Sequence, residues 1–183
     1  VVTEMVEGCL DGRVRAMYVV GENPLLSEPD LCHAEKAISQ LDCLIVQDLF
    51  MHETAERAHV FLPAAAFAEK DGTFTNSERR VQRVRQAIPP PGEVKPDWWI
   101  TCELARRVAR RLGLPETGFD YRHPSEIWDE LVGLWPAAAG ITYARPEAGG
   151  LQWPCPTPEH PGTRFLYGDD FPRGRARFVP VTQ

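Results

Sequence analysis

Apolar runs that stop at polar or turn-forming residues predict three buried strands in the first third of the chain. They lie within residues 13–21, 42–48 and 59–63. Each run is rich in β-branched or aliphatic residues and is too short for a typical helix. Continuous apolar runs of this kind are typical of strands whose two faces are both covered.

Between these runs the apolar residues recur at helical spacing. One helix is predicted over residues 31–41, where the apolar face comprises Leu31, Ala34, Ile38 and Leu41. Ser27 is a candidate cap for this helix. A shorter helix is predicted over residues 52–58. Strands alternating with helices at this pace indicate a parallel sheet with crossover helices. We therefore expect an α/β fold, a Rossmann-like three-layer parallel sheet.

Two longer helices are predicted in the second half of the chain. The first covers residues 97–113, with Pro96 and Asp97 at its start, and its apolar face comprises Ile100, Leu104, Val108 and Leu112. Gly113 is a candidate C-cap. The second covers residues 123–135, and Ser125 is its predicted cap. Residues 136–174 form a Pro/Gly-rich, irregular tail, and a last strand is predicted over 175–181.

Composition limits the possible partners. The chain has 183 residues, a net charge of -6 and no dominant basic run, which argues against a nucleic-acid partner. No apolar run approaches the ~20 residues of a membrane helix, so no membrane insertion is expected. No signal peptide is visible, which favours a cytoplasmic location. The chain does not begin with Met, and its first residues resemble the end of an amphipathic helix. We therefore expect it to be part of a larger protein. A targeting signal could lie in the part that is not seen here.

The five cysteines show no metal-binding pattern. None pairs with another at CxxC spacing, and no histidine stands beside one at ligand spacing. Zinc and iron–sulfur sites need such clusters, so neither is expected. Cys32, Cys43 and Cys102 lie in apolar contexts and are predicted to be small buried side chains.

Polar residues follow the predicted strands at their carboxyl ends, where parallel sheets bind ligands. The candidates here and in the next polar stretch are Gly21, Glu22, Asn23, Gln47, Asp48, Lys70 and Asp97. Taken singly, each has a plainer interpretation, such as a closed turn, a loop cap, a solvated lysine or a first-turn helix acid. No nucleophile elbow, P-loop or GxGxxG fingerprint accompanies them.

Several segments together resemble one family, the molybdopterin oxidoreductases, and within it the large subunit of formate dehydrogenase. They read GENPLLSEPD, CLIVQDLFMHETAERAHVFLPAAAFAEKDGTFTNSERRVQ, KPDWW and GLQWPCP, with GTRFLYGDDFPRGRARFVPV near the end. Related nitrate reductases share segments like NSERR and GLQWP. A large subunit of respiratory NADH dehydrogenase shares the α/β layout but is expected to lack the GLQWPC tail.

The resemblance implies that the α/β part holds one half of a bis(molybdopterin guanine dinucleotide) cofactor with molybdenum. Carried over by motif, Gly21, Glu22 and Asn23 would lie along its guanosine end. Gln47 and Asp48 would meet the ribose and base. Lys70 would approach the phosphates, and Asp97 would bind the guanine.

The resemblance also implies a division of the chain. It comprises a partial α/β cofactor-binding domain at 1–66, an excursion at 67–95 that packs on another domain, a return helix at 96–115, and a helical and irregular tail at 116–183 that leads to a β-barrel domain outside the chain. Glu78, Arg79 and Arg80 would contact absent domains, or would pair locally instead.

The family's catalytic groups have no counterpart here. Its molybdenum-ligating Cys or selenocysteine, the neighbouring His, the active-site Arg and the iron–sulfur cysteines belong upstream. The resemblance thus implies a segment of an enzyme that oxidises formate to CO2 and passes electrons to NAD or another acceptor. We expect no catalytic and no metal-binding residue in this segment and no activity from it alone. Expected partners are the rest of the subunit and electron-transfer subunits. The alternatives are a nitrate reductase segment and a non-catalytic α/β module of an electron-transfer complex.

Overall fold

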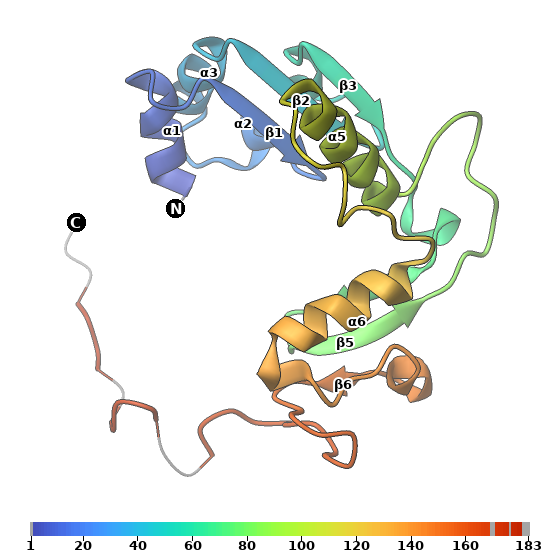
Figure 1. The fold of residues 1–183 in the computed structure, drawn as a ribbon. Helices are drawn as coiled ribbons and strands as arrows, with labels where there is room; N and C mark the ends of the chain where they lie inside the picture. Colours follow the sequence, from blue (N-terminus) through green and yellow to red (C-terminus); the bar gives the residue numbers. More distant parts are fainter. Residues whose placement is uncertain (1, 169–170, 176, 181–183) are drawn as a thin grey trace. The chain divides into compact units, whose positions relative to one another are not determined.

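The computed structural model describes residues 2–168, 171–175 and 177–180. The chain folds into two compact units (Figure 1). The parallel unit comprises the residues up to Asp71 together with Arg85–Tyr121. The antiparallel unit comprises Gly72–Val84 and the described residues from Arg122 onward. The segment that leaves the parallel unit is thus Gly72–Val84, whereas the Pro-rich connector after it belongs to the parallel unit.

The parallel unit is built on a three-stranded sheet. Its strands are β1 (Ala16–Val20), β2 (Cys43–Asp48) and β3 (Val60–Pro63), in the order β1-β2-β3. Both pairings are parallel, with Val20 opposite Gln47 and Gln47 opposite Leu62. The three strands lie where the apolar runs predict them, and the predicted α/β class is confirmed.

Helices accompany this sheet and close its core. They are α1 (Val2–Leu10), α2 (Pro24–Ser27), α3 (Leu31–Ser39), α4 (Glu53–Glu56) and α5 (Asp97–Arg111), with the 3-10 helix η1 at Phe67–Glu69. The buried core comprises Cys9, Val19, Ala37, Ile38, Leu41, Leu44, Val46 and Ala55. Asp30, not Ser27, caps α3, because its carboxylate accepts a hydrogen bond from the amide of His33 at 3.0 Å.

The predicted apolar face of α5 is buried only near its start. Ile100 is 8% exposed, but Val108 is 48% and Leu112 is 65% exposed. The other buried residues of α5 are Cys102 and Ala109, so the buried face differs from the predicted one. Leu112 forms the C-cap, and Gly113 follows it with φ +69°, the conformation expected after a helix end.

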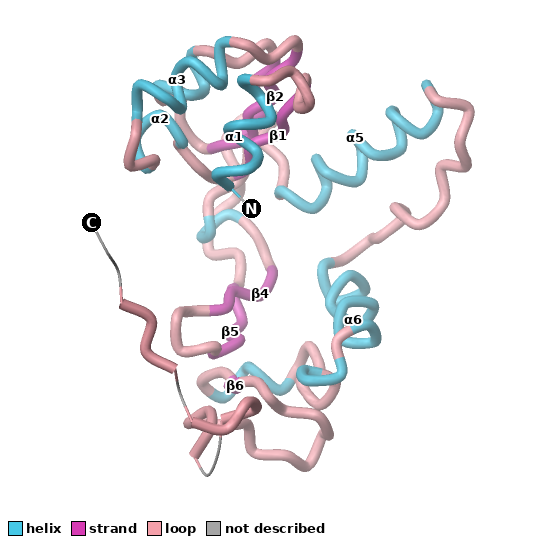
Figure 2. The backbone as a smooth tube through the Cα atoms, turned by 90° about the vertical axis from the view of Figure 1, so that its left-hand side faces the viewer, coloured by secondary structure: helices cyan, strands magenta, loops and turns pink. Residues whose placement is uncertain are grey.

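The antiparallel unit has its own sheet and core. Strands β4 (Gly72–Thr75), β5 (Arg80–Val84) and β6 (Leu151–Gln152) pair in that order, and Figure 2 shows β4 beside β5. The helices are α6 (Pro124–Leu134) and the 3-10 helices η2 (Pro136–Ala138) and η3 (Arg145–Ala148). Val81, Trp128, Ala138, Ile141 and Cys155 are buried together. The predicted irregular tail therefore contains a packed core.

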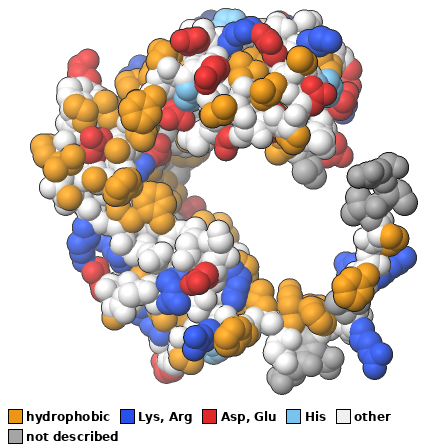
Figure 3. Space-filling model, turned by 180° about the vertical axis from the view of Figure 1, so that it is seen from behind, with side chains coloured by type: hydrophobic (Ala, Val, Ile, Leu, Met, Phe, Trp, Pro, Cys, Tyr) orange, Lys and Arg blue, Asp and Glu red, His pale blue; other side chains and the backbone are white. Residues whose placement is uncertain are grey.

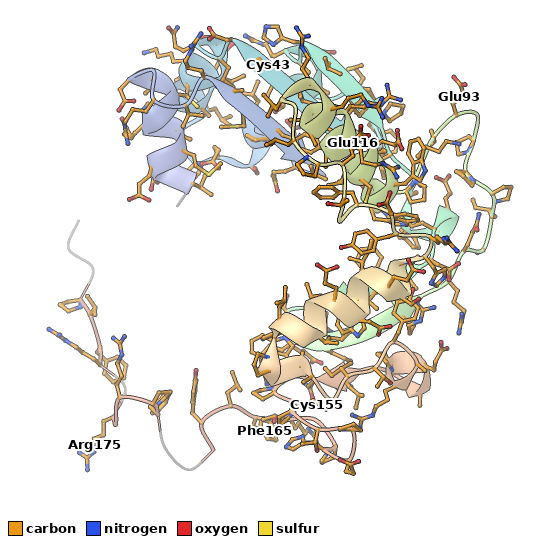
Figure 4. The ribbon with its side chains drawn as sticks, in the orientation of Figure 1. Cys43, Glu93, Glu116, Cys155, Phe165 and Arg175 are labelled. Carbon is orange, nitrogen blue, oxygen red and sulfur yellow. The ribbon has the colours of Figure 1, made fainter. Side chains whose placement is uncertain are left out.

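Arg145 organises the Pro/Gly-rich segment of this unit. Its guanidinium donates to the carbonyl oxygens of Gly140 and His160, the latter at 2.8 Å, and lies 3.2 Å from Cys155 Sγ. Gly140 must be glycine here, because a Cβ would lie 2.0 Å from the carbonyl oxygen of Thr157. Cys155, labelled in Figure 4, is fully buried at this point.

Three smaller predictions are wrong. His123 rather than Ser125 caps α6, because its Nδ1 accepts from the amide of Ser125 at 3.2 Å. Cys32 is exposed. Residues 177–180 form no strand, while residues 176 and 181 of that predicted strand lie outside the described residues.

The described contacts of the arginines after β4 are local to the antiparallel unit. Arg79 adopts a left-handed backbone, φ +64°, and donates to the carbonyl oxygens of Trp153 and Thr163. Arg80 Nε lies 3.7 Å from a carboxylate oxygen of Glu78. These local contacts match one of the two alternatives for these residues, and contacts with domains outside the chain stay a prediction.

Candidate functional site

All seven candidate residues belong to the parallel unit. Gly21, Glu22 and Asn23 follow β1, while Gln47 and Asp48 end β2. Lys70 follows η1, and Asp97 begins α5. The candidates therefore lie at the carboxyl ends of β1 and β2 or on segments that follow β3, the edge where parallel sheets bind ligands.

Three of the candidates form one hydrogen-bonded cluster, Gln47–Asp97–Lys70. Gln47 Nε2 donates to Asp97 Oδ1 at 2.8 Å, and Lys70 Nζ forms an ion pair with Asp97 Oδ2. On its other side, Gln47 Oε1 accepts a hydrogen bond from the hydroxyl of Tyr18. Gln47 is fully buried, and both polar atoms of its side-chain amide have protein partners.

The chain brings these distant residues together through a short link beside β3. An isolated parallel bridge joins Ala64 to Lys95, and the amide of Ala65 donates to the carbonyl oxygen of Lys95 at 2.9 Å. Pro96 follows in an extended conformation and occupies the N-cap position of α5, without a side-chain capping bond. The helix therefore starts next to the end of the sheet, and Asp97 meets Gln47 across 50 residues of sequence.

The cluster remains accessible at its acidic end. The Asp97 side chain is 37% exposed and that of Lys70 is 19% exposed. Each carboxylate oxygen can accept more than one hydrogen bond, so Asp97 keeps acceptor capacity beyond its two protein partners. Burial, together with the nearby charge of Asp97, raises the pKa of Tyr18, although a hydrogen bond with Thr101 acts in the opposite direction. Tyr18 is thus a neutral donor to Gln47.

The loop after β1 is held by its own contacts. Gly21 has φ +63°, its amide donates to the carbonyl oxygen of Gln47 at 2.9 Å, and nothing lies within 4 Å of where a Cβ would be. Asn23 donates to Glu53 Oε2 at 2.7 Å and accepts from the hydroxyl of buried Thr54 at 2.7 Å. The side chain of Asn23 therefore ties this loop to α4.

Two further candidates also have protein partners. Glu22 Oε1 accepts from the hydroxyl of Ser27 at 2.6 Å. Asp48 Oδ1 accepts from the amide of Leu49 at 2.6 Å, and its Oδ2 lies 3.4 Å from His52 Nε2. Glu22, Asn23 and Asp48 are thus at the same edge of the sheet but outside the Gln47–Asp97–Lys70 cluster.

Sequence reasoning missed the residues that support these candidates. They are Tyr18, His52, Glu53 and Thr54. Glu53 and Thr54 lie in the predicted helix after β2, at the sheet edge where the candidates gather. That position could have indicated their supporting role from the sequence. Tyr18 carries no such signal, because its place in β1 looks like that of any strand residue.

The described residues offer little for other kinds of site. In residues 2–168, 171–175 and 177–180, no group of three or more His, Cys, Asp or Glu side chains could hold a metal ion. No helix in those ranges is long and apolar enough to cross a membrane. On the face drawn in Figure 3, basic and acidic side chains are interspersed rather than gathered into a basic field.

Comparison with known proteins gives concordant matches. A family model described as molybdopterin oxidoreductase matches residues 2–107, a range that includes all seven candidates. The chain is 47% identical over 171 residues to the alpha subunit of F420-dependent formate dehydrogenase 2 of Methanococcus maripaludis, covering 92% of this chain and 25% of that protein. It is 46% identical over 170 residues to the F420-dependent formate dehydrogenase subunit alpha of Methanocaldococcus jannaschii, covering 92% and 24%.

A solved structure agrees with these matches at the level of fold. Acetylene hydratase from Pelobacter acetylenicus superposes with a TM-score of 0.59 at 22% identity, over 82% of this chain and 20% of that one. The chain spans about a quarter of the length of the two curated relatives it matches. The resemblance stated from the sequence is confirmed, and both relatives are alpha subunits of formate dehydrogenases.

Proposed function

Because this chain belongs to the molybdopterin oxidoreductase family, we propose that its parallel unit holds the nucleotide end of a bis(molybdopterin guanine dinucleotide) cofactor in a formate dehydrogenase alpha subunit. The Gln47–Asp97–Lys70 cluster is the observation that carries the proposal. It sets an accessible carboxylate beside an ammonium group at the ligand-binding edge of a parallel sheet.

The chemistry of the cluster fits a guanine nucleotide. Guanine presents two adjacent donors, N1–H and the exocyclic N2–H₂, and one carboxylate can accept both in a paired, charge-assisted arrangement. Asp97 has the exposure and the acceptor capacity for this. Lys70 supplies a positive charge for the phosphates, and the open space over Gly21 lets a ligand approach the backbone closely.

The remaining candidates take supporting roles in this proposal. Gln47 orients Asp97, and Asn23 fixes the loop on which Gly21 and Glu22 lie. Asp48 would accept a hydrogen bond from the ribose. The bound cofactor would supply the redox chemistry that takes formate to CO2, whereas the residues of this chain bind and orient its nucleotide end.

The wider assignments follow the relatives. We propose that the whole protein carries iron–sulfur clusters outside this segment and works with the rest of its subunit and with electron-transfer subunits. Both methanogen relatives are named as F420-dependent, so F420 is the first electron acceptor to test, ahead of NAD. Those names favour formate over nitrate as the substrate.

The test uses the assembled subunit with Asp97→Ala and Lys70→Ala, and Glu93→Ala as the control. Glu93 projects from the exposed connector in the same unit (Figure 4). Guanine nucleotide released from each purified variant is quantified by chromatography. Asp97→Ala should weaken nucleotide retention by about 5- to 150-fold, the equivalent of ~1–3 kcal/mol for donors left without a partner.

The base preference separates the roles of the two residues. Asp97→Ala should also reduce the advantage of a guanine cofactor over a cytosine or adenine analogue, while Lys70→Ala should weaken retention of all three alike. Glu93→Ala should behave as the unmodified protein. Full occupancy and an unchanged base preference in Asp97→Ala would show that this residue is only a helix-start acid.

A further inference from the structure

One buried ring nitrogen at the candidate site lacks a partner. His52 caps α4, because its Nδ1 accepts a hydrogen bond from the amide of Ala55 at 3.3 Å. When Nδ1 of a neutral imidazole is the acceptor, the proton is on Nε2. Nε2 of His52 is buried and has no hydrogen-bond partner within the described part of the chain. It is therefore a donor whose bond is not yet made.

A carboxylate that can accept this hydrogen bond lies next to it. Asp48 Oδ2 is 3.4 Å from His52 Nε2, and the two side chains are only 16% and 14% exposed. The other oxygen, Oδ1, already accepts from the amide of Leu49 at 2.6 Å. A buried carboxylate is costly unless its oxygens are hydrogen-bonded. Oδ2 has acceptor capacity left, and His52 Nε2 lies 3.4 Å from it.

The distance between them is slightly longer than a formed bond. N–H···O bonds typically measure 2.7–3.2 Å between heavy atoms, and bonds at functional sites commonly shorten when the ligand arrives. A small reorientation of the two side chains would form this one. The neighbouring acid, Glu53, is engaged by the amide of Asn23, which leaves Asp48 as the acceptor for His52.

We propose that His52 is a positioning residue for the cofactor site: by donating Nε2–H to Asp48 Oδ2, it holds the Asp48 carboxylate ready to accept from a hydroxyl of the nucleotide. This inference rests on the proposed function, and it adds a residue that the motif comparison did not assign. Asp48 would touch the ligand, and His52 would act only through Asp48.

Two substitutions separate this role from simple capping of α4. His52→Asn keeps an acceptor for the amide of Ala55, since asparagine is a good N-cap, but its amide is too short to reach Asp48. His52→Gln places an amide donor near the position of Nε2 but gives up the cap. If His52 only caps α4, the glutamine variant should be the more impaired of the two. If His52 positions Asp48, the asparagine variant should release nucleotide faster than the glutamine variant.

The experiment measures the dissociation of guanine nucleotide from the intact subunit, with the melting temperature recorded for each variant. His52→Asn should release nucleotide about tenfold faster at an unchanged melting temperature, the loss expected for one hydrogen bond to a charged group. Asp48→Asn should do the same, and the double variant should be no worse than either single one. His52→Gln should retain most of the affinity.

The results also distinguish this inference from the proposed function. Unchanged release from His52→Asn, or additive losses in the double variant, would overturn the positioning role even if Asp97→Ala still loses nucleotide. Loss from the His52 and Asp48 variants with full retention in Asp97→Ala would keep the positioning role and remove the guanine assignment. If His52→Asn melts early, the release rate from His52→Gln decides: wild-type release supports positioning, and fast release overturns it.

Discussion

Replacing Gln47 with leucine tests whether one buried amide holds the candidate site together. Gln47 is fully buried in the central strand and makes two side-chain hydrogen bonds, one from Tyr18 and one to Asp97. Leucine has a similar size and suits a buried strand, so the backbone pairing should survive. The substitution removes both hydrogen bonds at once.

The expected loss of stability is modest. The half-buried hydroxyl of Tyr18 loses its acceptor, at a cost of roughly 1–3 kcal/mol for an unsatisfied group. Asp97 keeps Lys70 and is 37% exposed, so water replaces most of its lost bond, at about 0.5–1.5 kcal/mol. The apolar surface of leucine returns about 1 kcal/mol. The net destabilisation of the parallel unit should be about 0.5–3.5 kcal/mol, by summing these terms.

Native-state hydrogen exchange at the amides of β2 reports on this unit specifically. Gln40→Leu is the matched control, because Gln40 is exposed at the end of α3 in the same unit, and it should change the opening free energy by less than about 0.5 kcal/mol. If Gln47→Leu is as stable as the Gln40 control, the Tyr18–Gln47–Asp97 chain contributes nothing, and the reasoning about the cluster is wrong.

Three further predictions concern the 183-residue chain on its own. Its purified form should contain no stoichiometric molybdenum or iron and oxidise no formate, since those ligands are expected upstream; metal by elemental analysis together with turnover would contradict this. It should self-associate, because β1 is an outer strand of the described sheet; a clean monomer by sedimentation at about tens of micromolar would count against that. Burial raises the pKa of the Cys102 thiol, so little of the reactive thiolate forms there. Iodoacetamide at about pH 8 should therefore label the exposed Cys32 before Cys102. Equal labelling rates would refute the assigned burial.

The strands were predictable because their signal is local. Each apolar run in the first third ends at a residue that stops a strand, and the alternation of strands with helices predicts a parallel sheet. The strand order β1-β2-β3 was not predicted. Residues at the strand ends, such as Gln47, could be proposed as ligand contacts from that placement alone. Their actual partners could not, because Asp97 reaches Gln47 only through the link between Ala64 and Lys95.

The wrong or missing predictions have several physical causes, none of which a local sequence pattern records. Periodicity identifies apolar residues on a helix face but does not say how much of that face is covered, so Val108 and Leu112 are exposed despite their spacing. Caps depend on which neighbouring side chain reaches the free amide, and here Asp30 and His123 reach it rather than serine. The core around Cys155 depends on contacts between distant loop carbonyls and Arg145, for which no sequence pattern exists.

The most direct test of the central claim is a reconstruction of the cofactor-loaded subunit at a resolution that shows side chains. We predict that the guanine edge lies within hydrogen-bond distance of the Asp97 carboxylate, with Lys70 turned toward the phosphates and Gln47 still bonded to Asp97. A nucleotide end bound elsewhere, with the Asp97 carboxylate contacting only Lys70 and Gln47, would contradict the account.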